Sequence, residues 1–162
     1  MRKKNKLIII CSLVIIFAGV IGLYKSYSSS IDSNKYLSSS DESECSFFYH
    51  ENEKITKDGQ SFHFGKFDGK WSLMGFTSSK GDKIIINDKT QITKGKFYIV
   101  VLDSDYNIIA KKNELNQKGN IKFTTPKDGK YIIRIVGASA GGNFNIKVSS
   151  GHNIYITHKD FM

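Results

Sequence analysis

The sequence predicts an all-β protein, a single antiparallel β-sandwich of jelly-roll-like form. Short segments alternate apolar and polar residues with the period of two that is typical of half-buried strands. Turn-forming Gly, Asp and Asn residues separate these segments at intervals of about 8–12 residues. Beyond an apolar N-terminal run, no segment shows the period of a helix. A sandwich domain needs about 100 residues, and we assign it to residues 45–157.

The expected strands follow one another along this domain. They are Ser61–Phe67, Trp71–Phe76, Lys83–Asn87, Lys96–Leu102, Asn107–Lys111, Asn120–Thr124, Lys130–Val136, Asn143–Val148 and Asn153–Thr157. Lys96–Leu102 is apolar on both faces, as a central strand would be. An Asp68-Gly69 turn predicts a hairpin between the first two strands. A glycine-rich loop predicts a second hairpin, which joins Lys130–Val136 to Asn143–Val148.

The N-terminus predicts a membrane segment. Residues 1–6 form a basic stub, and the apolar run Leu7–Leu23 follows it. As a helix the run would be about 26 Å long, at the short end for a span, and the preceding positive charge orients the rest of the chain outward. We therefore expect a single-pass signal anchor at residues 7–24, with its N-terminus in the cytoplasm. The alternative is a signal peptide cut near Ser28, which gives a secreted protein.

Residues 25–44 predict a flexible linker. The segment Ser26–Glu44 is rich in serine and acidic at its end. Such a composition offers little apolar surface to offset the entropy that ordering costs. We therefore expect a disordered tether between the anchor and the sandwich.

Part of the domain resembles a known family. The pattern Gly129–Gly137, a loop and then Gly142–Val148 is similar to the closing hairpin of bacterial pre-peptidase C-terminal domains, and Lys96–Asn107 is similar to a middle hairpin of that family. The resemblance covers about the second half of the domain. It implies a jelly-roll-like sandwich on a secreted protein, often with a binding or targeting role. It supplies no ligand or calcium residues for this chain.

The charge balance suggests possible partners. The formal net charge is +9, which suits an anionic cell-wall polymer, although evenly spread lysines are also typical of a plain solvated surface. Nucleic acid is not expected, because the domain lies outside the cell and carries no nucleic-acid recognition motif.

Aromatic residues are the first candidates for ligand contact. Trp71, Tyr98, Tyr106 and Tyr131 could form a platform for sugar rings or a peptide, with Lys and Asn at its rim. The competing interpretation is core packing, which is favoured for Trp71 because it lies in register with Leu73.

A calcium loop is a weaker candidate. Asp103, Asp105, Asn107 and Glu114 fit the ligand spacing of positions 1, 3, 5 and 12. However, Ile108 occupies the position where such a loop needs glycine. A turn rich in Asp and Asn explains the same residues, so we expect no metal and no other cofactor.

The sequence also gives little support for a catalytic site. Gly137–Gly141 matches G-x-S-x-G, but a strand and not a helix is expected to follow it, so a hairpin loop is favoured over a nucleophile elbow. The four histidines lack zinc spacing. Because Cys11 lies inside the apolar run, Cys45 is expected to be an odd thiol, either free or paired between chains, and an inert half-buried thiol is favoured.

These observations predict a non-enzymatic, membrane-anchored, extracytoplasmic binding module for envelope polymer, glycan or another exported protein. The alternatives are a secreted adhesin or effector and a structural subunit of a surface assembly. An enzyme is the least expected class.

Overall fold

The computed structural model describes Gly19 and residues 31–159. Apart from Gly19, the predicted anchor at residues 7–24 lies outside the described residues. The predicted stub and the predicted cleavage position also lie outside them. Within the part of the chain that the structure describes, no helix has the length and apolar character needed to cross a membrane.

The described residues form an all-β fold, which confirms the predicted class. The elements are α2 (Asn34–Ser38), β1 (Ser46–Phe47), β2 (His50–Thr56), β3 (Gly59–Ser78), β4 (Lys83–Asp88), β5 (Gln91–Asp103), β6 (Ile108–Asn113), β7 (Ile121–Thr124), β8 (Gly129–Ser150) and β9 (Ile156–His158). All strand pairs are antiparallel.

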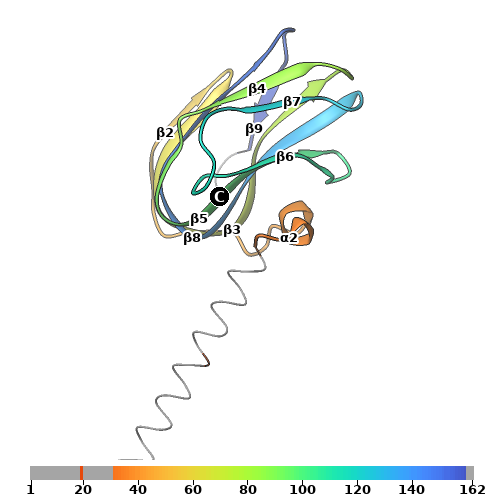
Figure 1. Cartoon of the computed structure of the whole chain (residues 1–162). Coiled ribbons are helices and arrows are strands. Elements are labelled where there is room, and N and C mark those ends of the chain that lie inside the picture. The colour runs from red at the N-terminus through yellow and green to blue at the C-terminus, as the bar shows by residue number, and fades with distance from the viewer. Residues whose placement is uncertain (1–18, 20–30, 160–162) are drawn as a thin grey trace, which may run out of the picture.

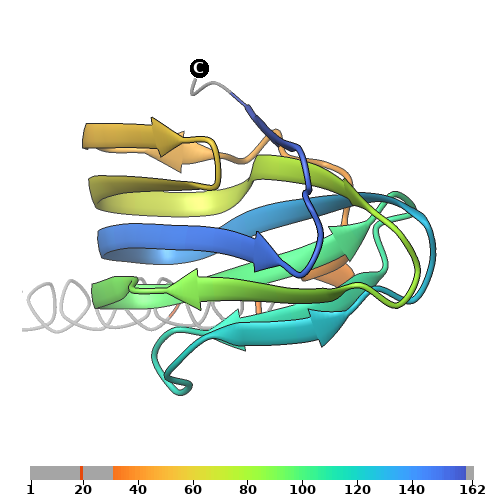
Figure 2. The ribbon, with the colours of Figure 1, turned by 90° about the horizontal axis from the view of Figure 1, so that it is seen from above.

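The strands form two layers that share β3 and β8. The open layer consists of β2, the first half of β3, the second half of β8, β4 and β7, which lie side by side in Figure 2. The covered layer consists of β9, the second half of β3, the first half of β8, β5 and β6. In Figure 1, β4 and β7 lie at the top of the domain and α2 lies at the bottom, on the side of the covered layer.

Both predicted hairpins are wrong, because each is one long strand. Strand β3 continues through Asp68-Gly69, and β8 continues through the glycine-rich segment Gly137–Gly142. The two strands pair from Gly59↔Lys147 to Ser78↔Gly129, with register shifts near Phe67. The segment that carries the resemblance to pre-peptidase C-terminal domains is therefore a single strand here, and that family assignment stays a prediction.

The glycines mark the places where the long strands bend from one layer into the other. Gly69 has a φ of +98°, and a Cβ there would lie 2.3 Å from the carbonyl oxygen of Glu44. A Cβ on Gly137 would lie 2.5 Å from the Phe67 ring. A glycine inside a strand thus allows a bulge and a close approach of backbones, as well as a turn.

The core between the layers is mostly aromatic on the side where the strands bend. Phe47 stacks on Phe67 with ring centroids 4.4 Å apart, and Phe64 lies 5.4 Å from Phe97. These phenylalanines come from β1, β3 and β5, and the three inside the main strands are fully buried. Burial of this apolar area is the main term that stabilises the fold.

Residues 31–44 form a strap, the N-terminal strap, which packs on the outer face of the covered layer. In this range the structure differs from the predicted flexible linker. Leu37 of α2 and Ile31 are completely buried and pack with Val100 of β5 and Val136 of β8. Because the segment is rich in serine, these few apolar residues give no recognisable sequence pattern. They cover the outer face of β5, which is itself apolar.

A buried arginine fastens the strap to the sheet. Arg134 projects from β8 and is fully buried. Its Nη1 donates to the carbonyl oxygens of Leu37 (3.0 Å) and Ser39 (2.7 Å), and its Nε donates to the Ser72 hydroxyl (3.2 Å). Its Nη2 lies 3.1 Å from Glu42 Oε1. The strap therefore supplies both the anion and the carbonyl acceptors that a buried guanidinium needs.

Candidate functional site

The structure buries three of the four aromatic residues proposed as ligand contacts. Trp71 is 2%, Tyr98 8% and Tyr131 0% exposed, so these rings belong to the interior. The Tyr98 hydroxyl donates to Asp32 of the N-terminal strap (2.9 Å). Tyr106 is half-buried, and the Arg134 guanidinium lies 5.3 Å from its ring centroid. The four residues therefore do not form an exposed platform.

The structure also separates the residues of the calcium candidate. Asp103 accepts hydrogen bonds from the Asp105 and Asn107 backbone amides within one turn, and Lys127 Nζ lies 3.0 Å from its Oδ2. Burial alone would raise the pKa of Asp103, but hydrogen bonds from the side chain and backbone of Asn107, from Lys127 and from the Asp105 amide outweigh it and hold the pKa at about 2. The lysine ammonium thus pairs with the carboxylate that a cation would need.

Glu114 belongs to a different cluster, which also contains Asp88 and Lys112. Lys112 Nζ lies 2.5 Å from Asp88 Oδ2 and 3.1 Å from Glu114 Oε2, and all three side chains are buried. Burial and a hydrogen bond with Asp88 raise the pKa of Glu114 to about 8. For Asp88, hydrogen bonds from Glu114 and Lys112 outweigh burial and lower the pKa. Glu114 therefore holds a proton at neutral pH. Within residues 31–159, no group of three or more His, Cys, Asp or Glu side chains could hold a metal ion.

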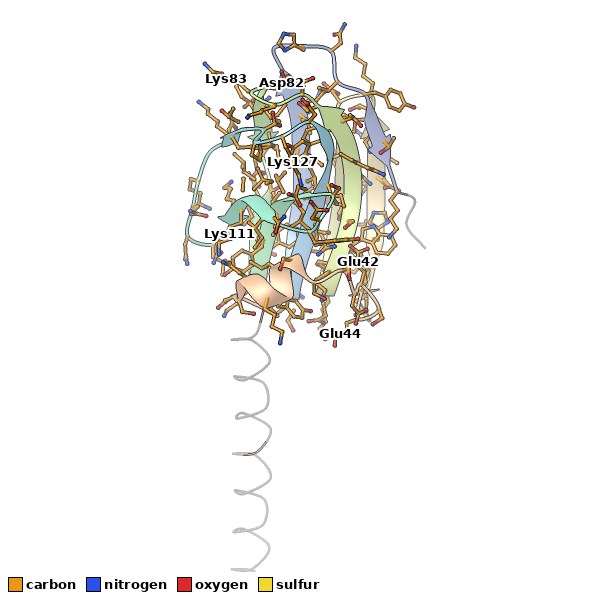
Figure 3. All side chains as sticks on the ribbon, turned by 90° about the vertical axis from the view of Figure 1, so that its right-hand side faces the viewer. Glu42, Glu44, Asp82, Lys83, Lys111 and Lys127 are labelled. Atoms are coloured by element: carbon orange, nitrogen blue, oxygen red, sulfur yellow. The ribbon has the colours of Figure 1, made fainter. Side chains whose placement is uncertain are left out.

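The outer face of the open layer is polar and basic. It contrasts with its inner face, where Phe144, Ile146 and Val148 of β8 enter the core. The outward side chains on β3, β8, β4 and β7 are Ser61, His63, Lys83, Ile85, Asn87, Lys122, Asn143, Asn145, Lys147 and Ser149. Figure 3 shows Lys83 at the end of the domain far from Glu42 of the strap. We call this surface the open face.

Two exposed aromatic residues stand beside this face. Phe48 is 82% exposed and Tyr49 is 48% exposed. Backbone hydrogen bonds from Phe48 to Lys66 (2.8 Å) and from Gly65 to Tyr49 (3.2 Å) fix this segment on β3. The two rings lie edge to face, with centroids 6.2 Å apart. They are held in place by the sheet although they are exposed to solvent.

A groove of about 410 Å³ begins at Tyr49 and crosses β3, β8 and β5. Its floor includes the glycines Gly65, Gly141 and Gly142, and its polar lining consists of His63, Gln91, Thr93, Lys94 and Asn143. We call this feature the aromatic groove. Its position coincides with the bend in β8, where the register with β5 shifts between Ile92 and Lys96.

Sheet register places the hydrogen-bonding side chains of the aromatic groove in one row. His63 of β3 pairs with Asn143 of β8, and Asn143 pairs with Gln91 of β5. Glu51 of β2 extends the row at its other end by pairing with His63. Neighbouring strands lie about 4.8 Å apart, so two amide groups and an imidazole, each able to donate and accept hydrogen bonds, follow one another at regular intervals.

The glycine floor explains how the groove is shaped. A Cβ on Gly65 would lie 1.8 Å from the Tyr49 ring, so the ring rests directly on the backbone there. A Cβ on Gly141 would lie 2.6 Å from the Lys94 side chain. Tyr49 and Lys94 therefore each lie over a glycine, one on each side of the groove. A side chain at either glycine would push them outward.

Other hollows carry fewer features of a binding site. A groove of about 480 Å³ is lined by Asp82, Asp128 and His152, and Asp82 already pairs with His152 at 3.1 Å. A groove of about 380 Å³ borders the strap at Glu42, which already pairs with Lys159 at 3.0 Å. Neither hollow is lined by an aromatic side chain that is exposed like Tyr49.

The half-buried thiol of Cys45 is free. Burial, and next the Glu42 carboxylate, raise its pKa to about 11. Such a thiol is a poor nucleophile at neutral pH.

No protein-family model matches this chain, and a search of curated proteins finds no match either. The sequence reasoning missed Phe48 and Tyr49. The signal lay in the run Ser46-Phe47-Phe48-Tyr49, where strand alternation directs Phe47 into the core and leaves Phe48 outside.

Proposed function

We propose that this protein is a non-enzymatic binding module for a glycan-containing envelope polymer. The observation that carries the proposal is the exposed ring of Tyr49, with Phe48 edge to face against it, beside a row of amide side chains in the aromatic groove. An aromatic ring stacks on the apolar face of a sugar while amides bond its hydroxyls. The open face, with Lys83, Lys122 and Lys147, gives an extended polymer further contacts beyond the groove.

Two alternative classes have less support. A subunit of a surface assembly would need an open strand edge or an exposed apolar sheet face. The outer edge strand β2 carries Glu51, Glu53 and Lys54, and a bulge with Asn52 at a φ of +56° interrupts its pairing, which are features that discourage strand addition. An enzyme would need converging titratable groups in its groove, and the lining of the aromatic groove contributes His63 and Lys94.

In the proposal, residues 7–24 hold the domain on the outer side of the membrane. The N-terminal strap adds a geometric consequence, because the packed part of the chain extends back at least to Ile31 and does not start at residue 45. At most residues 25–30 then separate the predicted span from the packed part of the chain. The module would therefore bind polymer close to the membrane surface. If the segment is cleaved as a signal peptide, the same site would act in a secreted protein.

The test is binding of the full chain, held in detergent micelles, to isolated envelope polysaccharide at low and high salt. The double substitution Phe48→Ser with Tyr49→Ala should weaken binding by about tenfold or more, because stacking is lost. Tyr155→Ala is the matched control, since Tyr155 is 81% exposed and does not line the groove. Equal losses in both variants, or no binding by the parent chain at low salt, would contradict the proposal.

A further inference from the structure

The aromatic groove is electrically asymmetric. Lys94 lies on the β5 side, and Glu51 lies on the β2 side beside His63. Among the described residues, no acidic side chain forms an ion pair with Lys94, whereas Lys66, Lys96 and Lys127 are all paired. A ligand in the groove therefore meets a positive charge at one end and a negative charge at the other.

The spacing of these groups selects a ligand of a definite size. Tyr49 rests on Gly65 of β3, and the Lys94 stem crosses Gly141 of the neighbouring strand β8. One strand spacing of about 5 Å separates the two supports, and the amide row of Asn143 and Gln91 runs alongside. That distance accommodates one pyranose ring stacked on Tyr49 with a substituent that reaches the Lys94 ammonium.

From this geometry we infer that the aromatic groove takes an anionic sugar unit, a pyranose bearing a carboxylate or a phosphate, with its charged group at Lys94 and away from Glu51. The inference rests on the proposed function, and it adds the ligand class and the orientation. The anion forms a charge-assisted hydrogen bond with Lys94, and the sugar hydroxyls face His63, Asn143 and Gln91.

The test compares polymers that share a sugar backbone and differ in charge, using the full chain in detergent micelles. Polygalacturonic acid and its fully methyl-esterified form carry the same sugar backbone, and dextran phosphate and dextran form the second pair. We expect the parent chain to bind an anionic member at least fivefold more tightly than its neutral partner. Preference for the carboxylate pair or for the phosphate pair distinguishes the two sources of charge.

Variants locate the charge recognition. Lys94→Gln should reduce this preference by about fivefold, because the ammonium group that pairs with the anion is removed. Lys35→Gln is the control, because Lys35 is an exposed lysine on α2, outside the open face and the groove lining. Glu51→Gln should strengthen binding of the anionic polymer, since it removes the opposing charge.

The outcomes separate the inference from the proposed function. Equal effects of Lys94→Gln and Lys35→Gln would show diffuse attraction and overturn the inference. Equal binding of charged and neutral polymers, still lost with Tyr49→Ala, would also overturn it while the proposed function stands. Absence of binding to every polymer and to envelope polysaccharide at low salt would overturn both.

Discussion

The two outer faces of the sandwich are built from the same long strands, yet one is covered and the other is open. The first half of β8 turns Arg134 and Val136 outward, under the N-terminal strap. The second half of the same strand turns Asn145 and Lys147 outward, beyond the strap. The side chains decide the difference. A strand that is apolar on both faces requires a cover, whereas an alternating strand can leave its polar face free.

The difference between the two faces also indicates where binding is expected. The polar groups of the covered face make internal contacts. Glu42 forms ion pairs with Arg134 and Lys159 and accepts a hydrogen bond from the Ser72 hydroxyl. On the open face, the polar contacts lie at the exposed surface: Asn87 donates to Ser149, and Lys147 lies 3.8 Å from Asp58. Ligand binding is therefore expected on the open face, whose outward side chains contribute little to the stability of the domain. The outward side chains of the covered face are expected to contribute most to that stability.

Arg134→Ala, on the covered face, should cause the largest loss of unfolding free energy. The substitution leaves Glu42 with one fewer cation and the Leu37 and Ser39 carbonyl oxygens without their donor. Breaking a buried ion pair costs about 3–5 kcal/mol of unfolding free energy. Denaturant unfolding of the full chain, followed by the fluorescence of buried Trp71, measures the loss. A loss below about 1 kcal/mol would mean that the strap is not fastened as described.

Leu37→Ala should have the second largest effect. Leu37 is completely buried between α2 and the covered layer, and truncation of a buried leucine costs about 2–5 kcal/mol. Hydrogen exchange should be faster in the variant at the backbone amide of residue 37, which in the parent chain donates to the Ser33 carbonyl oxygen. Lys35→Ala is the control, because Lys35 is exposed on the same helix. If both variants behave alike, the strap acts as a tether and does not serve as a cover.

Glu114→Gln should change how stability depends on pH. Folding raises the pKa of Glu114 from 4.5 to about 8, so the folded state holds a proton that the unfolded chain has released. This contribution is fully present below pH 4.5 and is lost as pH rises to about 8, by at most about 1.4 kcal/mol per pH unit.

With glutamine at position 114, the unfolding free energy should fall less between pH 5 and pH 8. The lowered pKa of Asp88 acts below this window, so it does not mask the effect. Unfolding curves at several pH values, recorded for both proteins, test the expectation. Parallel pH profiles would show that Glu114 does not hold the proton. The cluster joins the end of β4 to β6, so the experiment reports on the junction between the open and covered layers.

Lys83→Ala should have the smallest effect on stability. Lys83 is exposed on β4, and Figure 3 shows it at the end of the domain opposite the strap. Surface substitutions of this kind change the unfolding free energy by less than about 0.5 kcal/mol. The same unfolding assay gives the value. A larger loss would mean that the open face contributes to stability and would weaken the contrast between the faces.

Sequence reasoning predicted the strands that have simple boundaries. Lys83–Asn87 and Asn120–Thr124 match β4 and β7 to within a residue, because short alternating runs end at polar turn residues. It failed at Gly69 and at Gly137–Gly142, since a glycine permits a bend inside a strand as readily as a turn between two. Only the pairing partners, which are distant in sequence, decide between these outcomes.

The strap and the aromatic groove were missed for related reasons. Ile31 and Leu37 are too few to give a periodic pattern in a serine-rich segment. Their burial depends on the apolar outer face of β5, which a local pattern does not connect with them. For the groove, counting aromatic residues favoured Trp71 and Tyr131, whose rings are buried. The exposed ring of Tyr49 is positioned by Gly65, a contact between neighbouring strands.

The shared strands β3 and β8 have a consequence for how the domain folds. Gly59 pairs with Lys147 and Ser78 with Gly129, so the two strands meet across a large separation in sequence. Pairings of such high contact order close large loops before any contact stabilises them, which slows folding. Since each strand runs through both layers, neither layer can complete its hydrogen bonds alone. The domain should therefore fold slowly and in one cooperative step, with no half able to serve as a stable intermediate.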